Sequence, residues 1–182
     1  WSKRLLAIRS DQVKFEILHR VRAFQYGAEP VRFFLFENDK AHGLGESPLP
    51  DGQVRVFREN GRDGLAFLGE QQIRYVPVRA KAEINLGADR RVVYRKRPLE
   101  TRRDRFTFRR DRQGREWVHG WNVVAVWNDE IRNHTGKPIV LELRLRYPGD
   151  VDFRSEQSTR VFDHQTVETR ITVAPGGSAA YP

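Results

Sequence analysis

Acid–base catalysis or metal binding in this chain would have to start from its five histidines or its carboxylates, because it contains no cysteine. The histidines lie at positions 19, 42, 119, 134 and 164, and no two have the spacing of a metal-ligand pair on one strand or helix. His19 and His119 fall in the apolar phase of strand-like segments, so we expect both to be buried. His42, His134 and His164 lie in turn-like contexts, where we expect surface groups. No metal site is predicted.

Nucleophile and phosphate-loop motifs are also missing from the sequence. Ser47 and Ser178 stand outside any Gly-x-Ser-x-Gly pattern, and the glycines of residues 43–45 lack the Lys-Ser/Thr that completes a phosphate loop. Asp150 and Asp152 are too few for Ca²⁺, which takes six to eight oxygen ligands. We therefore expect no enzyme activity and no cofactor.

Three tryptophans could bind a ligand through their rings. Trp117, Trp121 and Trp127 are separated by even intervals, so in an extended strand they share one face and could stack on sugar rings or on unpaired bases. Val123 and Ala125 lie in the same phase. The pattern favours burial of this row in a core, with Trp117, near the strand end, the most exposed.

The second candidate surface is the arginine-rich run of residues 95–115. The chain has 27 arginines among its 33 basic residues and a net charge of +9. Arginines interleaved with phenylalanines can contact phosphates and stack on bases. Carboxylates interrupt the run, which favours a solvated strand face over a binding site for nucleic acid, anionic polysaccharide or a membrane surface. The arginines proposed for such a site are Arg102, Arg103, Arg109 and Arg110.

The elements that must position these residues are strands. Apolar and polar side chains alternate in residues 13–21, 31–36 and 139–147, and Gly, Pro and Asn-Gly turns separate the segments. Residues 116–128 are apolar in both phases, so we expect a central strand. Leu141 and Leu143 are predicted core residues.

The predicted fold is an all-β, antiparallel β-sandwich of immunoglobulin-like or larger super-sandwich type with negligible helix. We expect one domain over residues 1–182 without an internal repeat, and residues 95–101 are where a crossover between subdomains would fall. No apolar run reaches the roughly 20 residues that a membrane-spanning helix needs. The chain has no methionine and begins with Trp1, so we expect a fragment of a longer protein.

Residues 49–76, LPDGQVRVFRENGRDGLAFLGEQQIRYV, combine a Leu-Pro-x-Gly turn, a strand, a glycine-rich turn and a second strand. This sequence pattern closely resembles the C-terminal domain of unknown function in the mucoidy-inhibitor-A-like bacterial proteins. The resemblance extends to the strands expected at residues 31–38, 82–93, 137–145 and 167–181. That family has no established activity, so the resemblance implies no active-site residue. It implies a bacterial envelope, periplasmic or secreted location.

We therefore expect a non-enzymatic structural or protein-interaction module, whose partner is a protein or another domain of the same longer chain. Carbohydrate binding or carbohydrate-active chemistry through an aromatic patch is the first alternative. Polyanion or nucleic-acid binding through residues 95–115 is the second.

Overall fold

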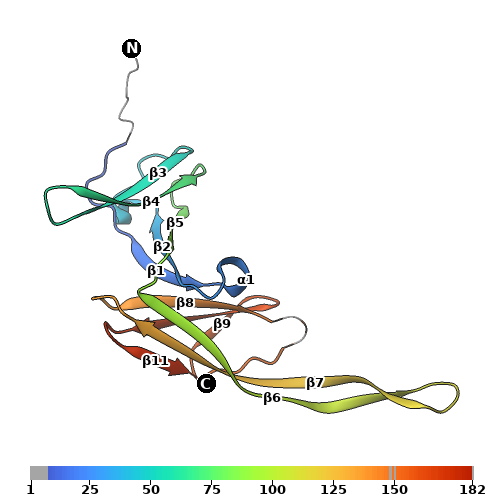
Figure 1. Ribbon diagram of the computed structural model, residues 1–182. Coiled ribbons are helices and arrows are strands. Elements are labelled where there is room, and N and C mark those ends of the chain that lie inside the picture. The colour runs from blue at the N-terminus through green and yellow to red at the C-terminus, as the bar shows by residue number, and fades with distance from the viewer. Residues whose placement is uncertain (1–7, 148, 150, 182) are drawn as a thin grey trace.

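The computed structural model describes residues 8–147, 149 and 151–181 and shows an all-β fold (Figure 1). Strands account for nearly all regular structure, and the helical segments of the described residues are one helical turn and one 3₁₀ turn. The prediction of a β-sandwich fold with negligible helix is confirmed. The elements are β1 Glu16–Val21, α1 Ala23–Tyr26, β2 Val31–Glu37, η1 Lys40–His42, β3 Gly52–Glu59, β4 Leu65–Ile73, β5 Lys81–Ala88, β6 Val92–Arg110, β7 Glu116–Asn133, β8 Ile139–Arg146, β9 Thr159–Asp163, β10 Thr166–Val173 and β11 Ser178–Tyr181.

The strands form three sheets. The largest has the order β5-β2-β1-β8-β10-β9, the second the order β11-β7-β6, and the third is the β3-β4 hairpin. Strands β1 and β8 run parallel, unlike every other strand pair in the part of the chain that the structure describes. This parallel pair joins two groups of strands that are far apart in the sequence.

The main core lies between β8 and β10 on one side and the base of the β11-β7-β6 sheet on the other. Leu141 and Leu143 of β8 are buried against Ile131 of β7 and Val92 of β6. The prediction of both leucines as core residues is confirmed. Strict alternation predicted them because every second residue of a strand points to the same face.

One pattern of strand pairing occurs twice along the chain. Strand β2 pairs with β1 and β5, and β7 pairs in the same way with β6 and β11. Between the second and last strands of each set lies an antiparallel pair, β3-β4 in the first set and β8-β10 in the second. The second set also contains β9, which pairs with β10. The sequence pattern did not indicate this repetition of the strand pairing.

A buried asparagine marks the same place in both sets. The Asn38 amide donates to the carbonyl oxygens of Val76 and Pro77, just before β5, and the Asn133 amide donates to those of Val173 and Ala174, just before β11. Both asparagines are fully buried. A buried amide needs such partners, since an unsatisfied polar group costs about 1 to 3 kcal/mol.

Strands β6 and β7 continue far beyond the rest of the molecule as a two-stranded hairpin (Figure 1). Strand β11 pairs with β7 from Asp129 to Arg132, and from Asn128 to the tip no third strand joins the hairpin within the described residues. We call residues 97–128 the arm and the remainder the body. The expectation that residues 116–128 form a central strand is wrong, because their two apolar faces belong to an uncovered ribbon.

Replacing Leu141 or Leu143 by alanine tests the assigned core. Each change should lower the free energy of unfolding by about 2 to 5 kcal/mol, because it removes buried methyl groups and leaves a cavity. Chemical denaturation of the purified variants provides the measurement. Val161→Ala is the matched control, since that side chain is 78% exposed and should change stability by less than about 0.5 kcal/mol. Wild-type midpoints for both leucine variants would contradict the assignment.

Candidate functional site

The arm carries the tryptophans that the sequence singled out. Trp117, Trp121 and Val123 of β7 are 47%, 42% and 59% exposed. The prediction that this row packs into a core is wrong for Trp121 and Val123, since no second layer of the described structure covers the arm. Trp117 is the most exposed of the three tryptophans, as predicted. Trp127 is half-buried at the base, where the ammonium of Lys96 lies 5.0 Å from its ring centroid. Trp117 and Trp121 thus form an aromatic surface on the arm.

The arginines of the arm are solvated, as predicted. Arg103 lies opposite Val123 in the hairpin, and its guanidinium is 4.4 Å from the ring centroid of Trp121. Arg109 lies opposite Trp117. Arg102 forms an exposed ion pair with Glu100 on its own strand, at 3.5 Å. The structure therefore places Arg103 and Arg109 beside the two tryptophans and leaves Arg102 apart from them.

The arm holds a large share of the chain's positive charge. Residues 97–128 contain eight arginines and four carboxylates, a net charge of +4 out of +9 for the whole chain. Arg110 reaches Glu116 at 4.0 Å across the hairpin. These exposed pairs contribute little stability, since surface ion pairs are worth about 0 to 1 kcal/mol.

Hydrogen bonds close the tip of the arm. The Asp111 carboxylate accepts from the backbone N–H groups of Gln113 and Arg115 and from the Arg115 guanidinium. These hydrogen bonds hold the pKa of Asp111 below its usual value, and the bond from the backbone N–H of Arg115 has the largest effect. Farther down, the register shifts between Asp104 and Thr107, where Arg105 adopts a φ of 49°. A residue inserted in this way is a β-bulge, which increases the local twist of the ribbon.

His119 is exposed on the arm, which corrects its predicted burial. The strand alternation that placed it in an apolar phase was right, but that phase faces solvent. Of the three histidines predicted at the surface, His134 and His164 are exposed and His42 is half-buried. Asp152 forms an exposed ion pair with Arg154, and Asp150 lies outside the described residues.

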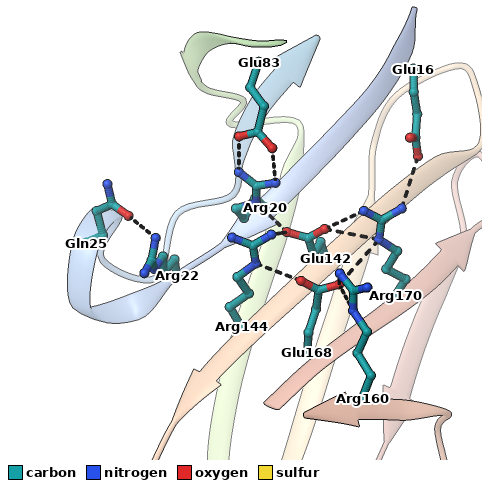
Figure 2. Close-up of polar contacts among 10 residues, drawn as sticks. All are labelled: Glu16, Arg20, Arg22, Gln25, Glu83, Glu142, Arg144, Arg160, Glu168 and Arg170. Atoms are coloured by element: carbon teal, nitrogen blue, oxygen red, sulfur yellow. Dashed lines mark hydrogen bonds and ion pairs between the residues drawn. The ribbon is translucent and has the colours of Figure 1, made fainter. Parts of the chain in front are cut away.

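A cluster of ion pairs lies on the six-stranded sheet (Figure 2). It is on the face opposite the main core, because Glu142 alternates along β8 with the core residues Leu141 and Leu143. Glu142 of β8 is fully buried and accepts hydrogen bonds from the guanidinium groups of Arg20 and Arg170. Arg144 lies 2.9 Å from the same carboxylate and also donates to Glu168 of β10. Ionised residues therefore fill this face of β8. The sequence missed the burial of Glu142, because a buried salt-bridged face and a solvated face share one alternation pattern.

Arg20 extends the cluster toward the other end of the sheet. Its guanidinium makes two parallel hydrogen bonds of 2.7 and 2.9 Å with the carboxylate of Glu83 on β5 (Figure 2). Burial alone would lower the pKa of Arg20, but the bonds with Glu83 and the charge of Glu142 raise it above its usual value. The same bonds lower the pKa of Glu83. At neutral pH both groups stay ionised.

A groove of about 920 Å³ is lined in part by Arg20, Glu83, Arg144, Glu168 and Arg170. Its carboxylates include Glu83 and Glu168, and each is held by an arginine. A general acid needs a carboxyl group whose pKa is raised toward neutrality. Ion pairing with arginine has the opposite effect. Glu83, whose pKa is lowered by Arg20, is therefore not suited to act as the general acid of glycoside hydrolysis. The ion pairs of Glu83 and Glu168 with arginines bind neighbouring strands together.

His19 is buried, as predicted, and its ring Nε2 lies 3.3 Å from Asp89. Burial lowers the pKa of His19, and the nearby carboxylate only partly offsets this effect. Asp89 is itself paired with Arg91, whose hydrogen bonds lower the pKa of that carboxyl. His19 is thus a neutral core histidine and no part of a solvent-accessible site.

Comparison with known protein families, with curated proteins and with solved structures finds no match for this chain. Among the described residues, no group of three or more His, Cys, Asp or Glu side chains is placed to bind a metal ion. In the same residues, no helix is long and apolar enough to cross a membrane.

The lowered pKa of His19 predicts how stability depends on pH. As the pH falls from about 7 to about 5, the unfolded chain binds a proton at His19 before the folded chain does, so the free energy of unfolding decreases. His19→Gln should reduce this slope, whereas His134→Gln, at an exposed position, should not. Denaturant unfolding at several pH values measures both slopes. Equal slopes for wild type and His19→Gln would contradict the assigned shift.

Proposed function

We propose that this chain is a non-enzymatic interaction module that binds a protein partner through the arm. The observation that carries the proposal is the exposure of Trp117, Trp121 and Val123 on a ribbon of two strands. An isolated two-stranded hairpin is marginally stable in water, and three or more strands or a packed layer are needed for independent stability. A partner that covers the arm would supply that layer.

The residue types of the arm favour a protein over a carbohydrate. A sugar ring stacks on the face of an aromatic ring, and the guanidinium of Arg103 lies over one face of Trp121, 4.4 Å from the ring centroid. Tryptophan and arginine together are the residues that most often dominate protein–protein binding energy. An envelope or secreted location remains an expectation that rests on the resemblance to the mucoidy-inhibitor-A-like proteins.

Site-specific photo-cross-linking tests the proposal. A benzophenone amino acid replaces Trp117 or Trp121 in the producing cells, and Tyr75 of the body, which is 57% exposed, serves as the matched aromatic control. We expect discrete covalent products from both arm positions and none from position 75, because a specific partner contacts only the arm. Product patterns that are the same at all three positions would refute the role of the arm.

Polyanion binding is a second candidate, favoured by the net charge of +4 on the arm and by the stacking of Arg103 on Trp121. The test replaces Arg102, Arg103, Arg109 and Arg110 by glutamine. The matched control makes the same change at Arg58, Arg62, Arg74 and Arg90, which are exposed and lie on the body.

Heparin affinity chromatography of both variants separates a site from a diffuse charge effect. Non-specific binding depends on charge alone, so each variant should elute earlier than wild type by a similar salt increment. We expect this equal shift. A loss of retention at about 0.15 M salt that is confined to the arm variant would establish a polyanion site and displace the protein partner as the leading proposal.

A further inference from the structure

The outer edge of β7 along the arm has the features of a pairing edge. Residues 117–128 contain no Asp, Glu, Lys, Arg or Pro. They form twelve consecutive residues of strand, an edge about 40 Å long. In the described structure this edge pairs with no other strand, because β11 reaches only as far as Asp129. Long, uncharged strand edges present free N–H and C=O groups that other strands can bind.

The opposite edge of the arm is protected. Residues 97–110 of β6 contain six arginines, two carboxylates and Pro98. The pairing with β7 is also irregular after Pro98 and around residues 104–108. Charges, proline and bulges are the means by which natural proteins prevent edge-to-edge pairing. The two edges of one hairpin therefore differ, and only the β7 edge is suited to accept a strand.

The fold already uses the β7 edge once. Strand β11 pairs with it in the antiparallel direction, from Ser178 opposite Arg132 to Tyr181 opposite Asp129. Among the described residues, the unpaired part of the edge begins at the next residue, Asn128. A strand added along the arm would continue an existing sheet and would not need to start a new one.

We propose that two copies of this chain pair through the arm, β7 against β7 in antiparallel orientation, so that the order β6-β7-β7-β6 forms one four-stranded sheet. The inference rests on the proposed function of the arm and identifies its partner. An antiparallel pair of identical strands has a two-fold axis, and each strand presents the same surface to the other. The axis lies near the middle of residues 117–128, beside Asn122 and Val123.

Charge explains why the partner is a second copy. Self-pairing through β7 brings no charged residue of one arm opposite its equivalent, whereas pairing through β6 would oppose arginine to arginine. An acidic partner would be attracted to the arginines of β6 and would leave the β7 edge free. The added strand also gives Trp121 and Val123 cross-strand neighbours, which stabilise a sheet when they are aromatic and β-branched.

Within the described residues, the body leaves the β7 edge of the arm uncovered. The arm extends away from the body, and its tip is the part farthest from the body (Figure 1). In an antiparallel pair the tip of one arm lies near the base of the other, so the two bodies occupy opposite ends of the shared sheet.

Disulfide trapping tests the arrangement directly, because the chain has no native cysteine. Single cysteines are placed in turn at each β7 position from 119 to 126, and at Thr101 and Arg103 of β6 as controls. A disulfide requires Cα atoms about 4.4 to 6.8 Å apart, which only residues beside the two-fold axis satisfy. We expect one or two adjacent β7 positions to form dimers under mild oxidation and the β6 positions to stay monomeric. Equal cross-linking on both strands would overturn the inference.

Sedimentation equilibrium of lysine variants provides the second measurement. The double change Val123→Lys and Ala125→Lys puts charge on the proposed edge, and the matched control puts lysine at Leu99 and Thr101 of β6. All four positions are exposed in the monomer, so folding should be unaffected. We expect a wild-type dimer that the β7 variant weakens by at least about 10-fold, with the β6 control unchanged.

The failure of this inference can be told apart from failure of the proposed function. A wild-type chain that stays monomeric from about 1 to about 100 μM overturns the self-pairing. If photo-cross-linking at Trp121 then joins the arm to a different protein, the arm remains an interaction surface with another partner. If position 121 gives no product beyond that of Tyr75, both proposals fail.

Discussion

The buried ion pair between Arg20 and Glu142 is the contact on which the arrangement of the sheets depends. It lies at the parallel junction of β1 with β8, where Val21 and Leu143 pair next to it and face the opposite, apolar core. Burying two charges is costly, and the cost is offset only when other hydrogen bonds complete both groups. Glu83 supplies these bonds for Arg20. Loss of one partner of such a pair costs about 3 to 5 kcal/mol, so the junction between the two strand sets requires the whole cluster.

The repeat in strand pairing shows why this junction occurs once. At the β1 side of the junction, His19 pairs with Arg32, which lies six positions before Asn38. In the second strand set, the residue six positions before Asn133 is Trp127, and it pairs with Pro98. Pro98 therefore takes the place of His19. At the β8 side, Ile139 pairs with Val173 and is followed by Val140. In the first strand set, Leu49 pairs with Val76 and is followed by Pro50, which therefore takes the place of Val140. Proline cannot donate a backbone hydrogen bond and is confined to strand edges. The two prolines are therefore unsuited to the backbone hydrogen bonds of a second parallel junction of this kind.

Sequence patterns predicted the strands and their apolar phases well, as Leu141, Leu143 and His19 demonstrate. They failed where the same pattern fits two environments. Apolar residues on both faces, as around Val123, indicate a central strand or an uncovered ribbon equally well, and alternating charges, as at Glu142, occur in solvent or in a buried ion-pair cluster. Only the tertiary arrangement decides between these. The pairing of Asn133 with Val173 also left no trace in the sequence, since the bonds go to backbone carbonyls, which every residue has.

The two strands of the arm divide its chemistry between them. Strand β6 carries most of the arginines, whose attraction to a polyanion weakens steeply as salt increases. Strand β7 offers backbone groups and apolar side chains, and burial of apolar surface is not screened by salt. At the base, Tyr94 donates to Asp129, and the Lys96 ammonium donates to the Tyr147 hydroxyl. The arm lies beyond these contacts. Substitutions that alter the charge or the strand edge of the arm therefore leave the core residues of the body unaltered. Salt dependence therefore distinguishes which strand of the arm a given partner contacts.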